Sequence, residues 1–177
     1  ILTNTGVWTR DGRWIVYDVR SDPAGSVFDG TRIERVDVAT GRVEVLYESR
    51  HGACCGVVTA SPADDRLVFI LGPEHPTPDW NYGPAHRQGV LWESGRVYPL
   101  EARDLVPPFT PGSLQGGTHL HTFSPSGDLV AFTYDDHLRP EWNRNVGICE
   151  PGPVMVPATH PRNHSGTHTA RLLTRTG

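Results

Sequence analysis

Apolar and polar residues alternate along much of this chain, and the alternation predicts short β-strands. Over residues 42–47, for example, Val43, Val45 and Tyr47 share one side, as expected for a half-buried strand. No stretch longer than ten residues keeps a helical period, so we expect essentially all-β structure. The expected strands are residues 7–9, 14–19, 32–38, 42–47, 56–59, 66–71, 89–92, 96–100, 118–122, 129–134, 145–149, 154–156 and 167–173.

A short phrase, a Ser or Thr followed by Pro or Arg and a turn, occurs four times. It begins at Thr9, Ser61, Ser124 and Thr174, with steps of 52, 63 and 50 residues. A period of about 50 residues built from short strands is typical of β-propeller blades. We therefore expect one partial β-propeller domain over residues 1–177. Its blades would be residues 1–50, 51–105 and 113–158, followed by the first strand of a fourth blade at 164–177.

Length and charge narrow the class of protein. At 177 residues the chain is too short for a closed propeller of about four blades of about 40–45 residues, and it begins with Ile1. We therefore expect part of a longer protein. A net charge of −4 argues against nucleic-acid binding. No apolar run approaches the roughly 18 residues of a membrane span, and three cysteines form neither a disulfide framework nor a metal motif.

Two resemblances rest on particular residues. The segment 123–133, Phe-Ser-Pro-Ser-Gly-Asp-Leu-Val-Ala-Phe-Thr, resembles the repeat of TolB-type (WD-like) propellers. Residues 117–125, 145–147 and 160–166 together resemble the YidR-type family of bacterial proteins, often labelled Tol biopolymer transporters. The resemblance implies a propeller of which this chain is roughly the N-terminal half, in the bacterial cytoplasm or periplasm. It implies little about function, because propellers host unrelated activities.

Histidines are the sharpest candidates for chemistry. His119 and His121 lie two residues apart in an expected strand, so both side chains should leave one face as a pair of metal ligands, for zinc or manganese. The alternative is that such histidines bond to water and backbone. A third ligand would come from a neighbouring blade, where His51 and His168 are the candidates, and Gln115 could add an oxygen.

A second, weaker resemblance concerns this histidine pattern. Gln115 with His119 and His121, and His51 one blade earlier, is similar to the ligand order of oligogalacturonate lyases. Those propellers hold manganese with three histidines and a glutamine, and their substrate is a polyanion. By this resemblance a metal would polarise the uronate carboxylate, a base would remove the adjacent proton, and Arg50 or Arg87 would hold the substrate. The sequence identifies no base.

The long polar insertion at 72–87 is the other candidate. Connections of this length are often functional, and its Trp80 is placed to stack on a sugar or peptide. The alternative is a loop that packs an aromatic ring on the blade rim. Its other candidate ligand-binding residues are Tyr82, His86 and Arg87. Asp135, Asp136 and His137 form either a cation site or a solvated turn.

Two functions follow. The first is a non-catalytic TolB-like scaffold that binds a protein or glycan at the channel mouth. The alternative is a metal-dependent lyase acting on acidic oligosaccharides. The sequence contains no GxSxG elbow, no catalytic cysteine context and no phosphate-binding loop, so it gives no other reaction class.

Overall fold

The fold is all-β. A computed structural model describes residues 1–2 and 4–175, and these residues contain no helix. Hence no helix among them is long and apolar enough to cross a membrane. The strands are β1 (Trp14–Asp18), β2 (Arg32–Asp37), β3 (Val43–Glu48), β4 (Cys55–Ala60), β5 (Leu67–Leu71), β6 (Gln88–Glu93), β7 (Arg96–Pro99), β8 (Ala102–Arg103), β9 (Ser113–Leu114), β10 (Gly116–Phe123), β11 (Val130–Asp136), β12 (Asn145–Val154) and β13 (Gly166–Leu172).

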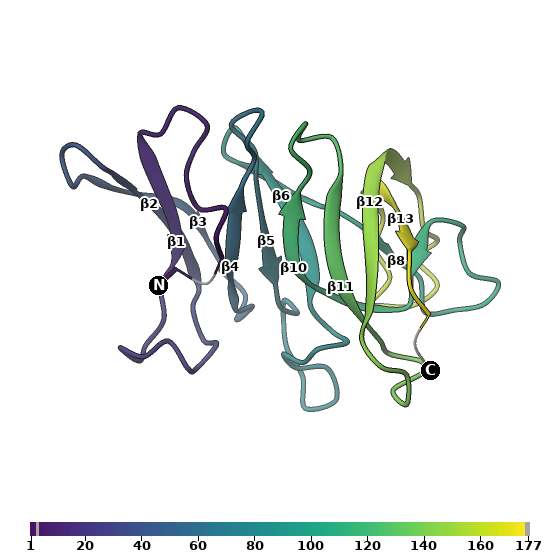
Figure 1. Ribbon diagram of the computed structural model, residues 1–177. Coiled ribbons are helices and arrows are strands. Elements are labelled where there is room, and N and C mark those ends of the chain that lie inside the picture. Colours follow the sequence, from purple (N-terminus) through teal and green to yellow (C-terminus); the bar gives the residue numbers. More distant parts are fainter. Residues whose placement is uncertain (3, 176–177) are drawn as a thin grey trace.

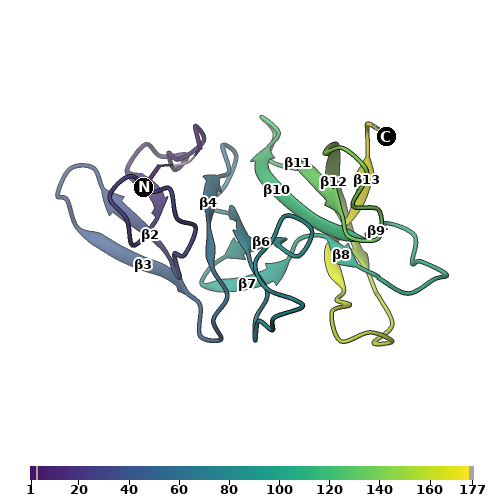
Figure 2. The same ribbon diagram turned by 90° about the horizontal axis from the view of Figure 1, so that it is seen from below.

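Three antiparallel sheets stand side by side in sequence order (Figure 1). The first sheet has the order β1-β2-β3, the second β4-β5-β6-β7 and the third β10-β11-β12-β13. Neighbouring strands in each sheet are consecutive in sequence, and some are joined by short hairpins, such as Ser94-Gly95 between β6 and β7. A small parallel pair, β8-β9, lies beside β13 (Figure 2).

The second sheet is packed on both faces. One apolar cluster joins it to the first sheet and contains Val16, Ile33 and Phe69, and another joins it to the third sheet and contains Val68 and Phe132. Because neighbours cover both faces, every residue of β4 and β5 is buried, whereas β1 alternates between buried and half-buried positions. The continuous apolar run of β5 is therefore the sequence signature of a strand enclosed on both sides.

The predicted strands of the first two sheets are confirmed within a few residues, with one difference. Residues 7–9 form only an isolated bridge, Trp8 to Ile15, so the first sheet has three strands. The third sheet differs more. β12 continues through Val154 instead of ending at Cys149, and β13 is its fourth strand.

Residues 164–177 were expected to begin a fourth blade, but β13 in this segment is instead the fourth strand of the third sheet. Pro151-Gly152-Pro153 has the composition of a turn, but the chain passes through it with only a shift in register between Pro151 and Val154. β12 thus reaches far enough to pair with β13 from Gly147 to Val154. The last two residues of the fourth phrase, 176–177, lie outside the described part of the chain.

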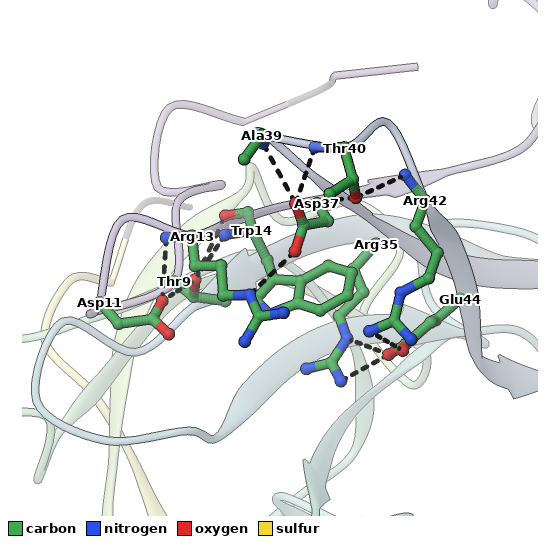
Figure 3. Close-up of polar contacts among 10 residues, drawn as sticks. All are labelled: Thr9, Asp11, Arg13, Trp14, Arg35, Asp37, Ala39, Thr40, Arg42 and Glu44. Carbon is green, nitrogen blue, oxygen red and sulfur yellow. Dashed lines mark hydrogen bonds and ion pairs between the residues drawn. The ribbon is translucent and has the colours of Figure 1, made fainter.

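The repeated hydroxyl residues shape the turns. Thr9 Oγ1 accepts a hydrogen bond from the Trp14 amide at 3.0 Å and donates to Asp11 Oδ1 at 2.6 Å (Figure 3). Ser124 Oγ likewise accepts the Leu129 amide at 3.1 Å, and Ser61 Oγ accepts the Ala63 amide at 3.2 Å. The repeated phrase is therefore a structural device that satisfies turn backbone groups.

Asp37 provides a test of this turn chemistry. Its Oδ1 accepts the amides of Ala39 and Thr40 at 3.1 and 3.0 Å, and its Oδ2 accepts Arg13 Nε at 2.8 Å (Figure 3). Replacing Asp37 by Ala leaves these donors without their acceptor, so we expect the melting temperature to fall by roughly 5 °C. Asp65→Ala, at an exposed turn position, is the matched control. Equal melting temperatures for the two variants in calorimetry would contradict this role.

Candidate functional site

His119 and His121 point to opposite faces of the third sheet. β10 contains a bulge, in which Leu120 has a φ of 53° and the register shifts between His119 and Thr122. His119 pairs with Thr133 on the face turned away from the second sheet, whereas His121 is buried against Phe132 on the inner face. The extra residue breaks the period-two alternation, so the expected same-face pair of ligands is wrong.

His121 belongs to a buried polar network between the second and third sheets. Its Nε2 lies 3.0 Å from Thr118 Oγ1, which donates to Glu101 Oε1 at 2.6 Å. Because the threonine proton goes to the carboxylate, His121 Nε2 is the donor in its own bond. Glu101 Oε1 also accepts the Gly89 amide at 2.8 Å. The network links three segments across the sheet interface, and burial lowers the pKa of His121 to about 3.

His119 lies instead beside a cluster of charges. Arg87 Nη2 is 3.3 Å from Asp135 Oδ2, and Arg144 Nε is 3.0 Å from the same oxygen. Burial and then the two arginines lower the pKa of His119 to about 4, so its ring is neutral at pH 7. Two cations thus converge on one carboxylate, and we call Arg87, His119, Asp135 and Arg144 the charge cluster.

The other expected metal ligands lie elsewhere. His51 is exposed and stacks on His75 at 4.5 Å, and His168 is buried in the outermost strand β13, with Nδ1 2.9 Å from Thr167 Oγ1. Gln115 lines a groove with Trp142. Within residues 1–2 and 4–175, no three His, Cys, Asp or Glu side chains form a group suited to a metal ion. Metal binding stays a prediction from sequence.

The insertion packs most of its aromatic residues on the protein. Trp80 is 7% exposed and stacks on His86 with ring centroids 3.9 Å apart. The guanidinium groups of Arg103 and Arg162 lie 5.6 and 5.7 Å from its ring, and Tyr82 stacks on Phe28 at 4.6 Å. Trp80 is therefore enclosed by side chains, as the packing alternative expected. Arg87, at the end of the insertion, is the residue that joins the charge cluster.

A histidine pair fastens the insertion to the loop after β11. His86 Nδ1 lies 3.0 Å from the Asn81 carbonyl, which can only accept, so Nδ1 carries a proton. His86 Nε2 lies 3.2 Å from His137 Nδ1, so the two rings share a hydrogen bond. The buried Arg103 donates to the carbonyls of His86 and Arg87 at 3.1 and 2.6 Å. These bonds fix the position of Arg87.

Sequence reasoning missed the roles of Asp135, Arg144, Arg103 and His137. The sequence marks Asp135-Asp136-His137 as a cluster, but the partners of this cluster lie about 50 residues away in sequence, at Arg87 and His86. The cysteines fit the expectation from sequence, since all three are free, and Cys55 and Cys149 are buried.

The fold defines an all-β protein with several antiparallel sheets, and comparison with known proteins places the chain in a family. The chain belongs to the family described as "Protein of unknown function (DUF3748)", whose model matches residues 54–164. It is 48% identical over 182 residues to a protein of Escherichia coli (strain K12) called "Uncharacterized protein YidR". This alignment covers 99% of the chain but 43% of the relative, so the chain spans less than half of the relative's length.

Proposed function

We propose that the three sheets are blades of a TolB-like β-propeller and that the protein is a binding scaffold. Its ligand is a protein or glycan that carries carboxylates, held at the charge cluster near the inner strands. A β-bulge that occurs at the same place in two of the sheets supports the blade arrangement. β4 contains a bulge at Val57, with a φ of 57°, and β10 contains one at Leu120, with a φ of 53°. Each lies four residues before the repeated serine.

The outer face of the third sheet also supports this arrangement. On this face Ala131 of β11 pairs with Ile148 of β12. The equivalent pair in the second sheet is Val68 and Leu91, and the third sheet covers that pair. In the third sheet the same positions have no sheet over them, and the adjacent Val146 is 42% exposed. A further blade would cover the apolar strand residues of this face and leave the sheet end with Arg144, in the loop before β12, open to a ligand. The Escherichia coli relative, of which the chain spans 43%, has the length for more blades.

The convergence of Arg87 and Arg144 on one carboxylate, Asp135, carries the ligand proposal. Arginine presents several donors in a planar array that matches carboxylates. Arg144 is 45% exposed, so a ligand can approach it. His119 beside it is neutral and neither attracts nor repels an anion. Two guanidinium groups close together on a protein of net charge −4 favour an acidic ligand over a neutral one.

Calorimetric titration tests this proposal with oligogalacturonate, an acidic peptide and a neutral oligosaccharide. We expect the acidic ligands to bind and the neutral one not to, with affinity falling as salt increases. Arg144→Glu should lower the affinity for the acidic ligands about tenfold or more. Arg171→Glu, on the same face at the outer strand, should have little effect. Equal affinity for the neutral oligosaccharide would contradict the proposal. New absorbance from an unsaturated product would instead support the lyase.

A further inference from the structure

A pocket of about 240 Å³ opens between the first and second sheets at their turn end. Its floor is apolar and consists of Val16, Leu46, Ala60 and Leu67, which belong to the core between these sheets. Pockets that take drug-sized ligands are typically about 300–1,000 Å³. This pocket is therefore suited to a single ring rather than to an extended molecule.

The pocket exists because one residue of the repeat is small. Ala60 immediately precedes Ser61, and the residue at this position in the third sheet, before Ser124, is Phe123. Phe123 is 7% exposed and fills the corresponding place in the core between the second and third sheets, where Arg66 lies 5.7 Å from its ring. Before Thr9 the repeat has Trp8. Alanine at position 60 thus leaves a space where the first and third copies have an aromatic ring and the fourth has Leu173.

Two tryptophans form the walls. Trp92 crosses from β6 and donates its indole N–H to the Leu46 carbonyl at 3.0 Å, which fixes its ring at the pocket. Trp14 stands on the other side, with the guanidinium of Arg35 4.1 Å from its ring (Figure 3). Arg35 is held there by Glu44, whose Oε2 accepts Nε at 2.8 Å and Nη2 at 2.6 Å. Because Arg35 already occupies the ring of Trp14, this wall does not select a cationic ligand.

The mouth combines acceptors and donors. The lining includes the carboxylates of Asp11, Asp64 and Asp65 and the guanidinium groups of Arg35 and Arg66, which leaves one excess negative charge. A carboxylate-bearing ligand is therefore disfavoured here, unlike at the cluster around Arg144. Hydroxyl groups, which both donate and accept, match such a mixed rim without requiring charge.

We propose that this pocket binds one pyranose ring of a neutral glycan. The C–H face of the sugar lies against the apolar floor and Trp92, and its hydroxyls bond to the carboxylates and arginines of the rim. The inference is independent of the carboxylate site, because it uses a different sheet interface and the opposite charge preference.

Saturation-transfer NMR and tryptophan fluorescence test the pocket with the methyl glycosides of glucose, galactose and mannose. We expect saturable binding of at least one, with a dissociation constant of roughly 1–10 mM. Ala60→Phe copies the residue of the third sheet, fills the pocket and should weaken binding at least tenfold while the melting temperature is kept. Asp65→Ala, at the exposed rim, should weaken binding several-fold.

Two controls make the outcome decisive. Ala131→Phe adds the same ring at an exposed position of the third sheet and should leave sugar binding unchanged. Arg144→Glu should leave it unchanged as well, although it removes binding of acidic ligands. Absence of saturable binding to all three glycosides would overturn the proposal. So would binding that survives both Ala60→Phe and Asp65→Ala, or a methyl galacturonide that binds as well as the neutral sugars.

Discussion

Replacing Gly89 by Ala is expected to destabilise the protein by about 3 kcal/mol or more. A β-carbon at this position would lie 2.7 Å from Glu101 Oε2 and closer still to His121 Nε2. Both side chains are fully buried, so neither has solvent to move into. The methyl group would separate the sheets locally and break the bonds that join Glu101, Thr118 and His121.

Thermal or urea denaturation measures this effect. Gly83→Ala is the matched control, because the nearest atom to its added carbon is His86 Nδ1 at 3.8 Å. His121→Val, which copies Val58 at the same place after the bulge in β4, should relieve part of the damage when combined with Gly89→Ala. A double variant as unstable as the sum of the two single variants would contradict direct contact between these residues.

The strands that sequence predicted well are those whose signals are local. Trp14–Asp18 and Val43–Glu48 carry period-two alternation and are bounded by turns whose side chains bond within a few residues. β5 was equally clear as a continuous apolar run. Hairpin neighbours lie close in sequence, so the order of strands in the first two sheets followed directly from the order of the segments.

The parts that sequence missed depend on distant contacts. Gly166–Leu172 has the composition of an inner strand, with a Gly-Thr-His start like that of β10, and only its pairing with the extended β12 makes it the outer strand. The bulge at Leu120 leaves no composition signal, yet it decides which face His121 occupies. A pattern of two histidines at i and i+2 therefore did not imply a ligand pair.

The charge cluster was only partly visible for the same reason. Arg87 was selected as a ligand-binding residue, but its partner Asp135 is 48 residues away and was interpreted as either a cation site or a solvated turn. Bringing them together requires the insertion to be fastened by His137 and Arg103, which is a property of packing rather than of spacing. The sequence therefore identifies which residues can take part in such chemistry, but it does not identify which residues lie next to them.

Acidification from pH 7 to pH 5 is expected to destabilise the protein strongly, because several histidines are buried as neutral rings. Burial lowers the pKa of His121 and of His164 to about 3, and burial followed by Arg87 lowers that of His119 to about 4. In the unfolded chain the histidine pKa is about 6.5. Below that pH the unfolded state binds more protons than the folded state, so the free energy of unfolding falls with pH.

The slope of this dependence can be measured by urea denaturation at several pH values between 7.5 and 5. Below about pH 6.5 the buried His121 and His164 each contribute about 1.4 kcal/mol per pH unit until the folded-state pKa is reached, so the two remove roughly 3 kcal/mol per unit. The half-buried His119 adds a smaller amount, because solvent screens its charge. The pKa of Asp37 is lowered to about 2, so the stability that Asp37 provides is lost only when the pH falls through the usual carboxylate range and below it. Asp37 therefore does not affect the slope between pH 7.5 and 5. Replacing His164 by Gln should reduce the slope by about one proton, whereas His51→Gln, at an exposed ring, should not. Identical slopes for these two variants would show that buried neutral histidines are not what makes the sheets sensitive to acid.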